Sequence, residues 1–261
     1  MKTYTFYFLL YLIFIVNTQV YSQINLTNNN LCNELQRLYD CQSDFKANRI
    51  IKKIISIESN YDTLSFYIKN YNFHTNKKVK TGYIEWEYEL DSIPYMAMIL
   101  VPGNYNPKQK YKISFILHGA VMNLNPFSAK SYINAKNYNT DSLDRIIIYP
   151  SGWMMSPWWC EKQVNNMQYL IRRLKQEYNI DENNIHLSGI SDGGTGIIYQ
   201  ANLNITPWAS FRPYISNPLS MERLSNYPVF YENLGNRPYL FISTDGDELF
   251  PPENIKLFLK R

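Results

Sequence analysis

The sequence predicts an α/β fold: a mainly parallel, doubly wound sheet with an antiparallel N-terminal hairpin and a small helical extension. An alternating hairpin pattern is followed by short, continuously apolar runs, which are typical of strands buried on both faces of a parallel sheet. Segments with helical apolar spacing separate these runs, and such alternation predicts helices on both faces. We expect a leader over residues 1–22, the helical extension over 23–78 and the sheet domain over 79–261.

The leader has the features of a secretory signal peptide. Lys2 supplies a positive charge, and an apolar run extends from Phe6 to Val16. Val20 and Ser22 then fit the positions that signal peptidase reads. The run is shorter than the roughly 20 apolar residues of a transmembrane helix. We therefore expect a secreted or periplasmic protein without stable membrane insertion; an uncleaved anchor is the alternative.

Charge and cysteine content exclude several classes of partner. The net charge is only +4, with basic residues scattered, so no nucleic-acid partner is expected. The spacing of Cys32, Cys41 and Cys160 is not that of a metal site, so we expect no metal and no cofactor. In an oxidising compartment Cys32 and Cys41 could pair, which leaves Cys160 over.

The extension and the sheet domain differ in their apolar patterns. Helical spacing over 32–39 and 45–57 predicts helices in the extension. Residues 83–90 alternate, 91–94 form a turn and 95–101 return, which predicts an antiparallel hairpin. Further strands are expected at 113–117, 145–149, 185–190 and 239–243, and helices at 161–178, about 193–202 and from near Pro252.

The strongest functional motif follows the strand expected at 185–190. Residues 189–194 read GISDGG, a G-x-S-x-G motif between a strand and a helix. A sharp turn there presents a serine as a nucleophile, and the glycines leave room for it. We therefore predict Ser191 as the nucleophile and the amide of Asp192, at the helix N-terminus, as one oxyanion donor. The alternative is a glycine-rich turn that only packs the helix on the sheet.

Two more segments follow strand ends, where function gathers in such sheets. His118-Gly119-Ala120 comes after the first buried strand, and we predict the amide of Ala120 as the second oxyanion donor, with His118 holding the loop. Asp247 lies in the loop after 239–243 and is predicted to orient a catalytic histidine. Asp245 is the second choice, and a solvated turn is the alternative.

Together these motifs resemble the α/β-hydrolase superfamily, in particular secreted esterases of the feruloyl-esterase and polyhydroxybutyrate-depolymerase kind and related peptidases. The resemblance extends from about Gly82 to Arg261 and includes the aromatic segment Pro157-Trp158-Trp159. It implies a serine hydrolase that cleaves a small-molecule or polymer carboxylic ester through an acyl-enzyme. Trp153, Trp158 and Trp159 could line its substrate pocket, or they could form a packed aromatic loop.

The position of the catalytic histidine departs from this pattern. In the family it follows the acid, whereas the three histidines here are His74, His118 and His186, and none fits that place. We therefore predict that the sequence is truncated at its C-terminus and that the base lies beyond Arg261. A catalytically inactive binding protein on the same fold is one alternative, and a serine peptidase is another. The oligomeric state is left open.

Overall fold

The computed structural model describes residues 28–41, 43–74, 78–131 and 135–259. The predicted signal peptide, residues 1–22, lies outside them. Among the described residues, no helix has the length and apolar character needed to cross a bilayer. The chain divides after Phe73 into two compact units, each of which is described by itself.

The first unit contains three helices, of which the sequence predicted two. They are α2 (Asn29–Tyr39), α3 (Asp44–Ile57) and α4 (Tyr61–Asn70). Leu31, Leu35 and Ile54 are buried in its small core together with Tyr67 of α4. The helix α4 is short, and its apolar residues are spread around most of its circumference. It therefore lacks the one-sided apolar spacing by which α3 could be predicted.

The three cysteines are free thiols, so the possible disulfide between Cys32 and Cys41 is not formed. Cys32 is buried in the core of the first unit. The thiol of Cys41 instead lies 3.3 Å from the carbonyl oxygen of Ser43. Cys160 belongs to the second unit and donates to the carbonyl oxygen of Pro157 at 3.0 Å.

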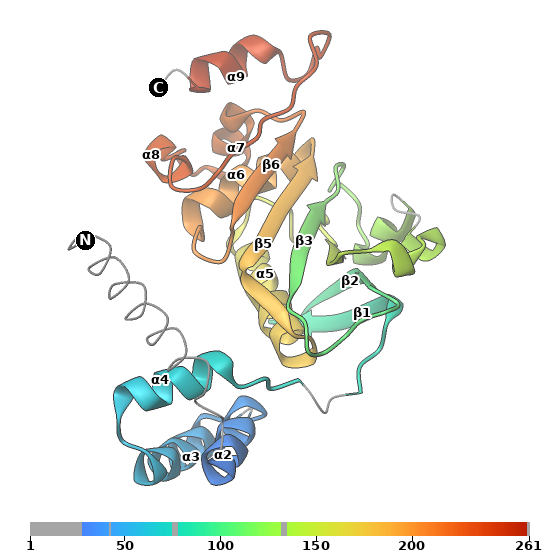
Figure 1. Cartoon of the computed structure of the whole chain (residues 1–261). Coiled ribbons are helices and arrows are strands. Elements are labelled where there is room, and N and C mark those ends of the chain that lie inside the picture. Colours follow the sequence, from blue (N-terminus) through green and yellow to red (C-terminus); the bar gives the residue numbers. More distant parts are fainter. Residues whose placement is uncertain (1–27, 42, 75–77, 132–134, 260–261) are drawn as a thin grey trace, which may run out of the picture. The chain divides into compact units, whose positions relative to one another are not determined.

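The second unit is built on a six-stranded sheet with the order β1-β2-β4-β3-β5-β6 (Figure 1). Strand β2 is antiparallel to both of its neighbours, β1 and β4, whereas β4, β3, β5 and β6 are mutually parallel. The predicted fold class is therefore confirmed. The strands are β1 (Gly82–Leu90), β2 (Ile93–Val101), β3 (Tyr111–Leu117), β4 (Arg145–Pro150), β5 (Ile180–Ile190) and β6 (Ser210–Tyr214).

From β4 onward, an α-helix follows each strand of this unit, and two further helices end the described chain. The described α-helices are α5 (Glu161–Glu177), α6 (Asp192–Leu203), α7 (Pro218–Ser225), α8 (Tyr231–Leu234) and α9 (Pro252–Leu259). Three short 3₁₀ helices precede β4: η1 (Pro126–Ser131), η2 (Ala135–Asn137) and η3 (Thr140–Ser142). The predicted helices at 161–178, 193–202 and after Pro252 are confirmed within a residue or two.

The hairpin closes through a two-residue turn. Asp91 and Ser92 have φ angles of 50° and 61°, and two left-handed residues in succession are the mark of a turn whose twist matches that of the strands. The register pairs Leu90 with Ile93. Strand β2 therefore starts two residues earlier than the sequence predicted.

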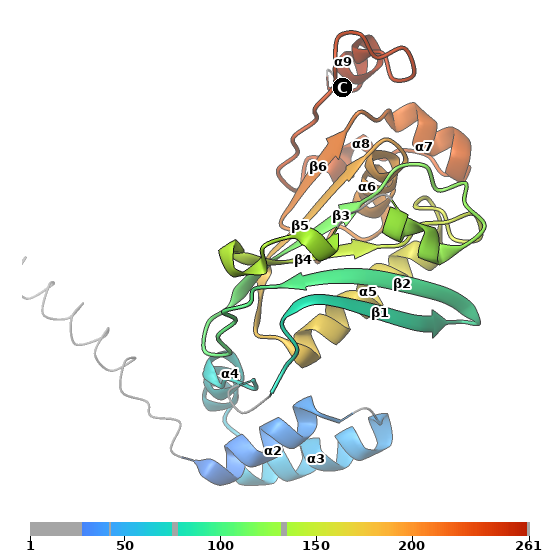
Figure 2. The same ribbon diagram turned by 90° about the vertical axis from the view of Figure 1, so that its right-hand side faces the viewer.

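The two faces of the sheet are covered differently. One face packs with α5 and α6 into the main core, where Ile113, Phe115 and Leu187 are fully buried. The opposite face of β2 and β4 is covered by η1 and η2 around Met96 and Met98. Figure 2 shows α5 behind β1 and β2, with the short helices on the other side. Helices thus occur on both faces, but the long ones α5 and α6 share one face.

The strand predicted over 239–243 is only partly formed. Two isolated bridges, Phe211–Tyr239 and Tyr214–Ile242, join it in parallel to β6. The strand β6 itself was missed because Arg212 and Pro213 interrupt its apolar pattern. It is ordered by pairing with β5 on one side and with this segment on the other.

Candidate active site

The turn between β5 and α6 places Ser191 in a strained backbone conformation. Its φ and ψ are 54° and −118°, a region that costs a non-glycine residue of order 1–3 kcal/mol. Two hydrogen bonds hold it there. The Ser191 amide donates to the Tyr214 carbonyl oxygen at 3.0 Å, and its own carbonyl accepts from Thr195 at 3.0 Å. The serine is thus fixed at the carboxyl end of a central strand.

The second glycine of the motif lets α6 lie close against β3. A Cβ on Gly193 would collide with the carbonyl oxygen of Leu117, which is backbone and cannot move aside. Larger residues would therefore push α6 and Ser191 away from the loop that follows β3. The motif glycine has a packing role and, through it, determines how near that loop comes to Ser191.

The loop after β3 lies directly against Ser191. A Cβ built on Gly119 would lie 3.3 Å from the Cβ of Ser191. The next residue, Ala120, has φ 53° and is exposed. Among the described residues, nothing accepts a hydrogen bond from the amides of Ala120 or Asp192. Two free N–H groups beside a serine are what an oxyanion hole requires.

Two side chains hold this loop in place. Oδ2 of Asp192 accepts a hydrogen bond from the amide of Val121 at 3.0 Å. Nδ2 of Asn123 donates to the carbonyl oxygen of Ala120 at 3.1 Å. The first bond ties the start of α6 to the loop, and sequence reasoning missed it because it joins residues 71 positions apart.

The ring of His118 supports the beginning of the loop. Its Nδ1 lies 2.6 Å from the carbonyl oxygen of Gly119, and its Nε2 accepts from the amide of Gly152 at 3.1 Å. Because an amide N–H only donates, Nε2 carries no proton and Nδ1–H is the donor. Burial lowers the pKa of His118, opposed by the bond to Gly119 and the charge of Asp192. Both nitrogens are engaged, which agrees with a loop-holding role.

Asp247 has one satisfied and one unsatisfied carboxylate oxygen. Its Oδ1 accepts from the amides of Leu249 at 3.0 Å and Phe250 at 2.9 Å. Its Oδ2 is buried and has no hydrogen-bond partner among the described residues. A buried carboxylate oxygen without a donor is costly, so the oriented carboxylate is poised to accept another hydrogen bond. None of the three histidines supplies that bond.

The predicted aromatic residues are mainly internal. Trp153 and Trp158 are 4% and 1% exposed, and Trp159 packs at the edge of the main core. Nε1 of Trp158 donates to the carbonyl oxygen of His118 at 2.8 Å. This burial favours the alternative of a packed aromatic loop. Trp158 then acts on the candidate site indirectly, since it supports the residue that holds the Gly119 loop.

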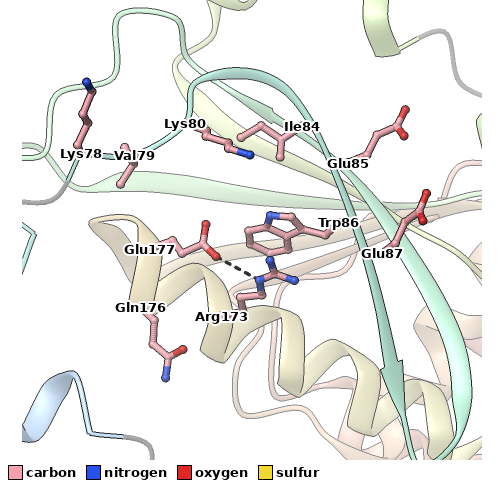
Figure 3. Close-up of a pocket in the computed structure, with 10 residues that line it drawn as sticks. All are labelled: Lys78, Val79, Lys80, Ile84, Glu85, Trp86, Glu87, Arg173, Gln176 and Glu177. Atoms are coloured by element: carbon pink, nitrogen blue, oxygen red, sulfur yellow. Dashed lines mark hydrogen bonds and ion pairs between the residues drawn. The ribbon is translucent and has the colours of Figure 1, made fainter.

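A separate pocket of about 520 Å³ lies between the start of β1 and the end of α5 (Figure 3). The guanidinium of Arg173 stacks 3.9 Å from the ring centre of Trp86 and donates to Glu177 at 3.1 Å. Glu85 on its wall pairs with Lys130 at 2.6 Å. No predicted site residue lines this pocket, and much of its charge is neutralised by neighbouring side chains.

Comparison with known proteins rests on structure. No protein-family model matches the sequence, and no curated protein is similar to it. A thermostable esterase matches with a TM-score of 0.53 and 20% identity over 68% of this chain, which spans 50% of that esterase. Esterase 2 of Thermogutta terrifontis, phosphorylated by paraoxon, matches with a TM-score of 0.53 and 16% identity, covering 69% of this chain and 76% of that one.

A third match is dipeptidyl peptidase 4 of Porphyromonas gingivalis, with a TM-score of 0.52 and 11% identity. It covers 68% of this chain but only 29% of the peptidase. At these identities the likeness concerns the fold, and the chain therefore has the α/β-hydrolase fold.

Proposed function

We propose that the protein is a serine hydrolase that cleaves carboxylic esters through an acyl-enzyme, with Ser191 as the nucleophile. The observation that carries this proposal is the left-handed backbone of Ser191 (φ 54°) at a strand–helix turn, with Gly119 lying against its side chain. Such strain gathers at functional sites, where it presents a reacting group.

Each proposed residue has one task in the reaction. The Ser191 hydroxyl oxygen attacks the acyl carbon, and its proton passes to a base. The amides of Ala120 and Asp192 stabilise the oxyanion of the tetrahedral intermediate. The intermediate expels the alcohol, which takes the proton from the base, and water then releases the acid from Ser191 by the same steps. Neither the steps nor the site residues need a metal or cofactor.

The base is proposed to be an imidazole that donates to Oδ2 of Asp247. A carboxylate in this role keeps the ring in the right tautomer and stabilises its charged form. The support is the buried, unpartnered Oδ2, which two backbone hydrogen bonds to Oδ1 hold in a fixed orientation. None of His74, His118 and His186 makes this hydrogen bond in the structure.

Export of the protein is proposed from the leader over residues 1–22. The support is its charge, apolar run and cleavage-site pattern. N-terminal sequencing of the mature protein should read from Gln23 onward. A mature protein that still begins at Met1 would contradict cleavage.

The nucleophile is tested by labelling with a fluorophosphonate. The protein, expressed from its complete reading frame without the leader, is treated with the probe and mapped by peptide mass spectrometry. We expect one labelled peptide that carries Ser191 and loss of that label in Ser191→Ala. The same preparation should hydrolyse 4-nitrophenyl acetate. A folded protein with no label would overturn the proposal and favour a binding protein on this fold.

A further inference from the structure

Four exposed apolar side chains lie on two loops beside the candidate site. Met122 and Leu124 are 70% and 78% exposed, and Met154 and Met155 are 46% and 59% exposed. We call these four residues the apolar rim. Single exposed apolar residues are common, but a gathered set on one edge of a soluble domain marks a binding surface.

Hydrogen bonds connect the rim to the loop against Ser191. The amide of Met154 donates to the carbonyl oxygen of Asn123 at 2.9 Å, and Asn123 lies between Met122 and Leu124 in the chain. The side chain of Asn123 in turn donates to the carbonyl oxygen of Ala120 at 3.1 Å. The two parts of the rim are thus joined to each other and to the proposed oxyanion donor.

The methionine part of the rim has no evident role in folding. Trp153 and Ser156 exchange two backbone hydrogen bonds of 3.2 and 2.9 Å, so Met154 and Met155 are the two central residues of a tight turn. Such positions favour Gly, Asn, Asp and Ser. Trp153 and Ser156 are buried and anchor the turn, which leaves both methionines on the surface.

We propose that the apolar rim binds the aliphatic chain of an ester whose carbonyl lies at Ser191, so that the preferred substrates carry a medium-length alkyl chain. The proposal rests on the proposed function and specifies its substrate class. All four side chains are uncharged and flexible, and methionine adapts to irregular apolar partners. The neighbouring rings of Trp153 and Trp158 are buried, so they offer no stacking surface for a planar aromatic group.

The test compares chain-length preference in a rim variant and a matched control. Leu124→Ser with Met155→Ser removes two exposed side chains that make no hydrogen bond through their side chains. Ile55→Ser with Leu224→Ser makes the same kind of change at residues of 52% and 51% exposure outside the rim. We expect the ratio of kcat/KM for 4-nitrophenyl decanoate over acetate to fall about tenfold in the rim variant and to be unchanged in the control. An unchanged ratio in the rim variant would overturn the proposal.

A binding measurement separates failure of this proposal from failure of the proposed function. Decanoate is titrated into Ser191→Ala by calorimetry, with and without the rim substitutions. Weaker binding in the rim variant supports the proposal even if the protein hydrolyses no ester. If the protein hydrolyses no ester, the proposal is overturned when decanoate binds equally to Ser191→Ala with and without the rim substitutions, or binds to neither. A change in oligomeric state caused by the rim substitutions would also overturn it, because the rim would then be an interface between copies.

Discussion

The turn between β5 and α6 that carries Ser191, here called the elbow, and the pocket between β1 and α5 differ in how many of their polar groups have partners. At the elbow, Ser191 and Ala120 have positive φ angles, and two amides lack acceptors among the described residues. In the separate loop after residues 239–243, Asp247 keeps a buried oxygen without a partner among the described residues. In the pocket, Arg173 is stacked on Trp86 and forms an ion pair with Glu177. Its positive charge is therefore already neutralised within the fold.

This difference shows why the presence of a pocket alone does not identify a functional site. A pocket whose charged groups pair with one another gains little by binding a charged ligand, because those pairs must first be broken. Strained backbone and unsatisfied donors have a free-energy cost that folding by itself does not explain. They therefore mark the elbow as the place where a reacting group is expected.

The largest expected effect is at Asp247. Asp247→Asn keeps an oxygen for the amides of Leu249 and Phe250, so the loop should stay folded. Turnover of 4-nitrophenyl acetate should nevertheless fall by about 10⁴-fold, because an amide favours the wrong imidazole tautomer. Asp245→Asn is the matched control and should be close to the wild type in kcat. If Asp245→Asn lost the activity instead, the acid would have been assigned to the wrong residue.

A smaller loss is expected at Asp192, whose side chain holds the Gly119 loop rather than touching substrate. Asp192→Ala removes the acceptor for Val121 and should lower kcat by about 10- to 100-fold with little change in KM, since it misplaces an oxyanion donor. Asp192→Asn keeps an acceptor and should recover most of the rate. Equal losses in both variants would mean that the charge, and not the hydrogen bond, matters.

A moderate effect on stability is expected from pH. Burial lowers the pKa of His118, and burial together with nearby cations lowers the pKa of His186. The unfolded chain therefore takes up protons first. The contribution of these neutral histidines to the free energy of unfolding is fully present above the ordinary histidine pKa of about 6.5. It decreases as the pH falls below that value. Urea denaturation at several pH values should show this decrease.

Two substitutions assign the pH effect to its source. His118→Gln and His186→Gln should each flatten the pH dependence, and the double variant should flatten it most. If stability still decreased with falling pH in the double variant, titratable groups other than these two histidines would be the cause. Only His118→Gln should also lower turnover, because only that ring holds the loop beside Ser191.

The smallest effect is expected in the pocket. Arg173→Met keeps the aliphatic stem over Trp86 but removes the cation, and it should lower the free energy of unfolding by about 0.5–1 kcal/mol. Turnover should not change. A lower kcat in Arg173→Met would contradict the distinction drawn between the two regions, because the pocket would then be coupled to the elbow.

Much of the fold followed from local patterns in the chain. The continuous apolar runs over 113–117 and 145–149 and the helical spacing over 161–178 each predicted an element that the structure contains. The strand β6 could not be predicted, because Arg212 and Pro213 hide its pattern and neighbouring strands order it. The segment 239–243 has a strand-like sequence, yet it forms only two bridges.

By itself, the sequence determined where a nucleophile could be presented. The glycines around Ser191 and the apolar strand before it are local requirements of a sharp turn, so they can be read from neighbouring residues. Only the tertiary structure decided what surrounds that turn. The bond from Val121 to Asp192 and the contact of Gly119 with Ser191 join residues about 70 positions apart. Likewise, burial of Trp158 and exposure of Met155 depend on how the loops pack, which no local pattern specifies.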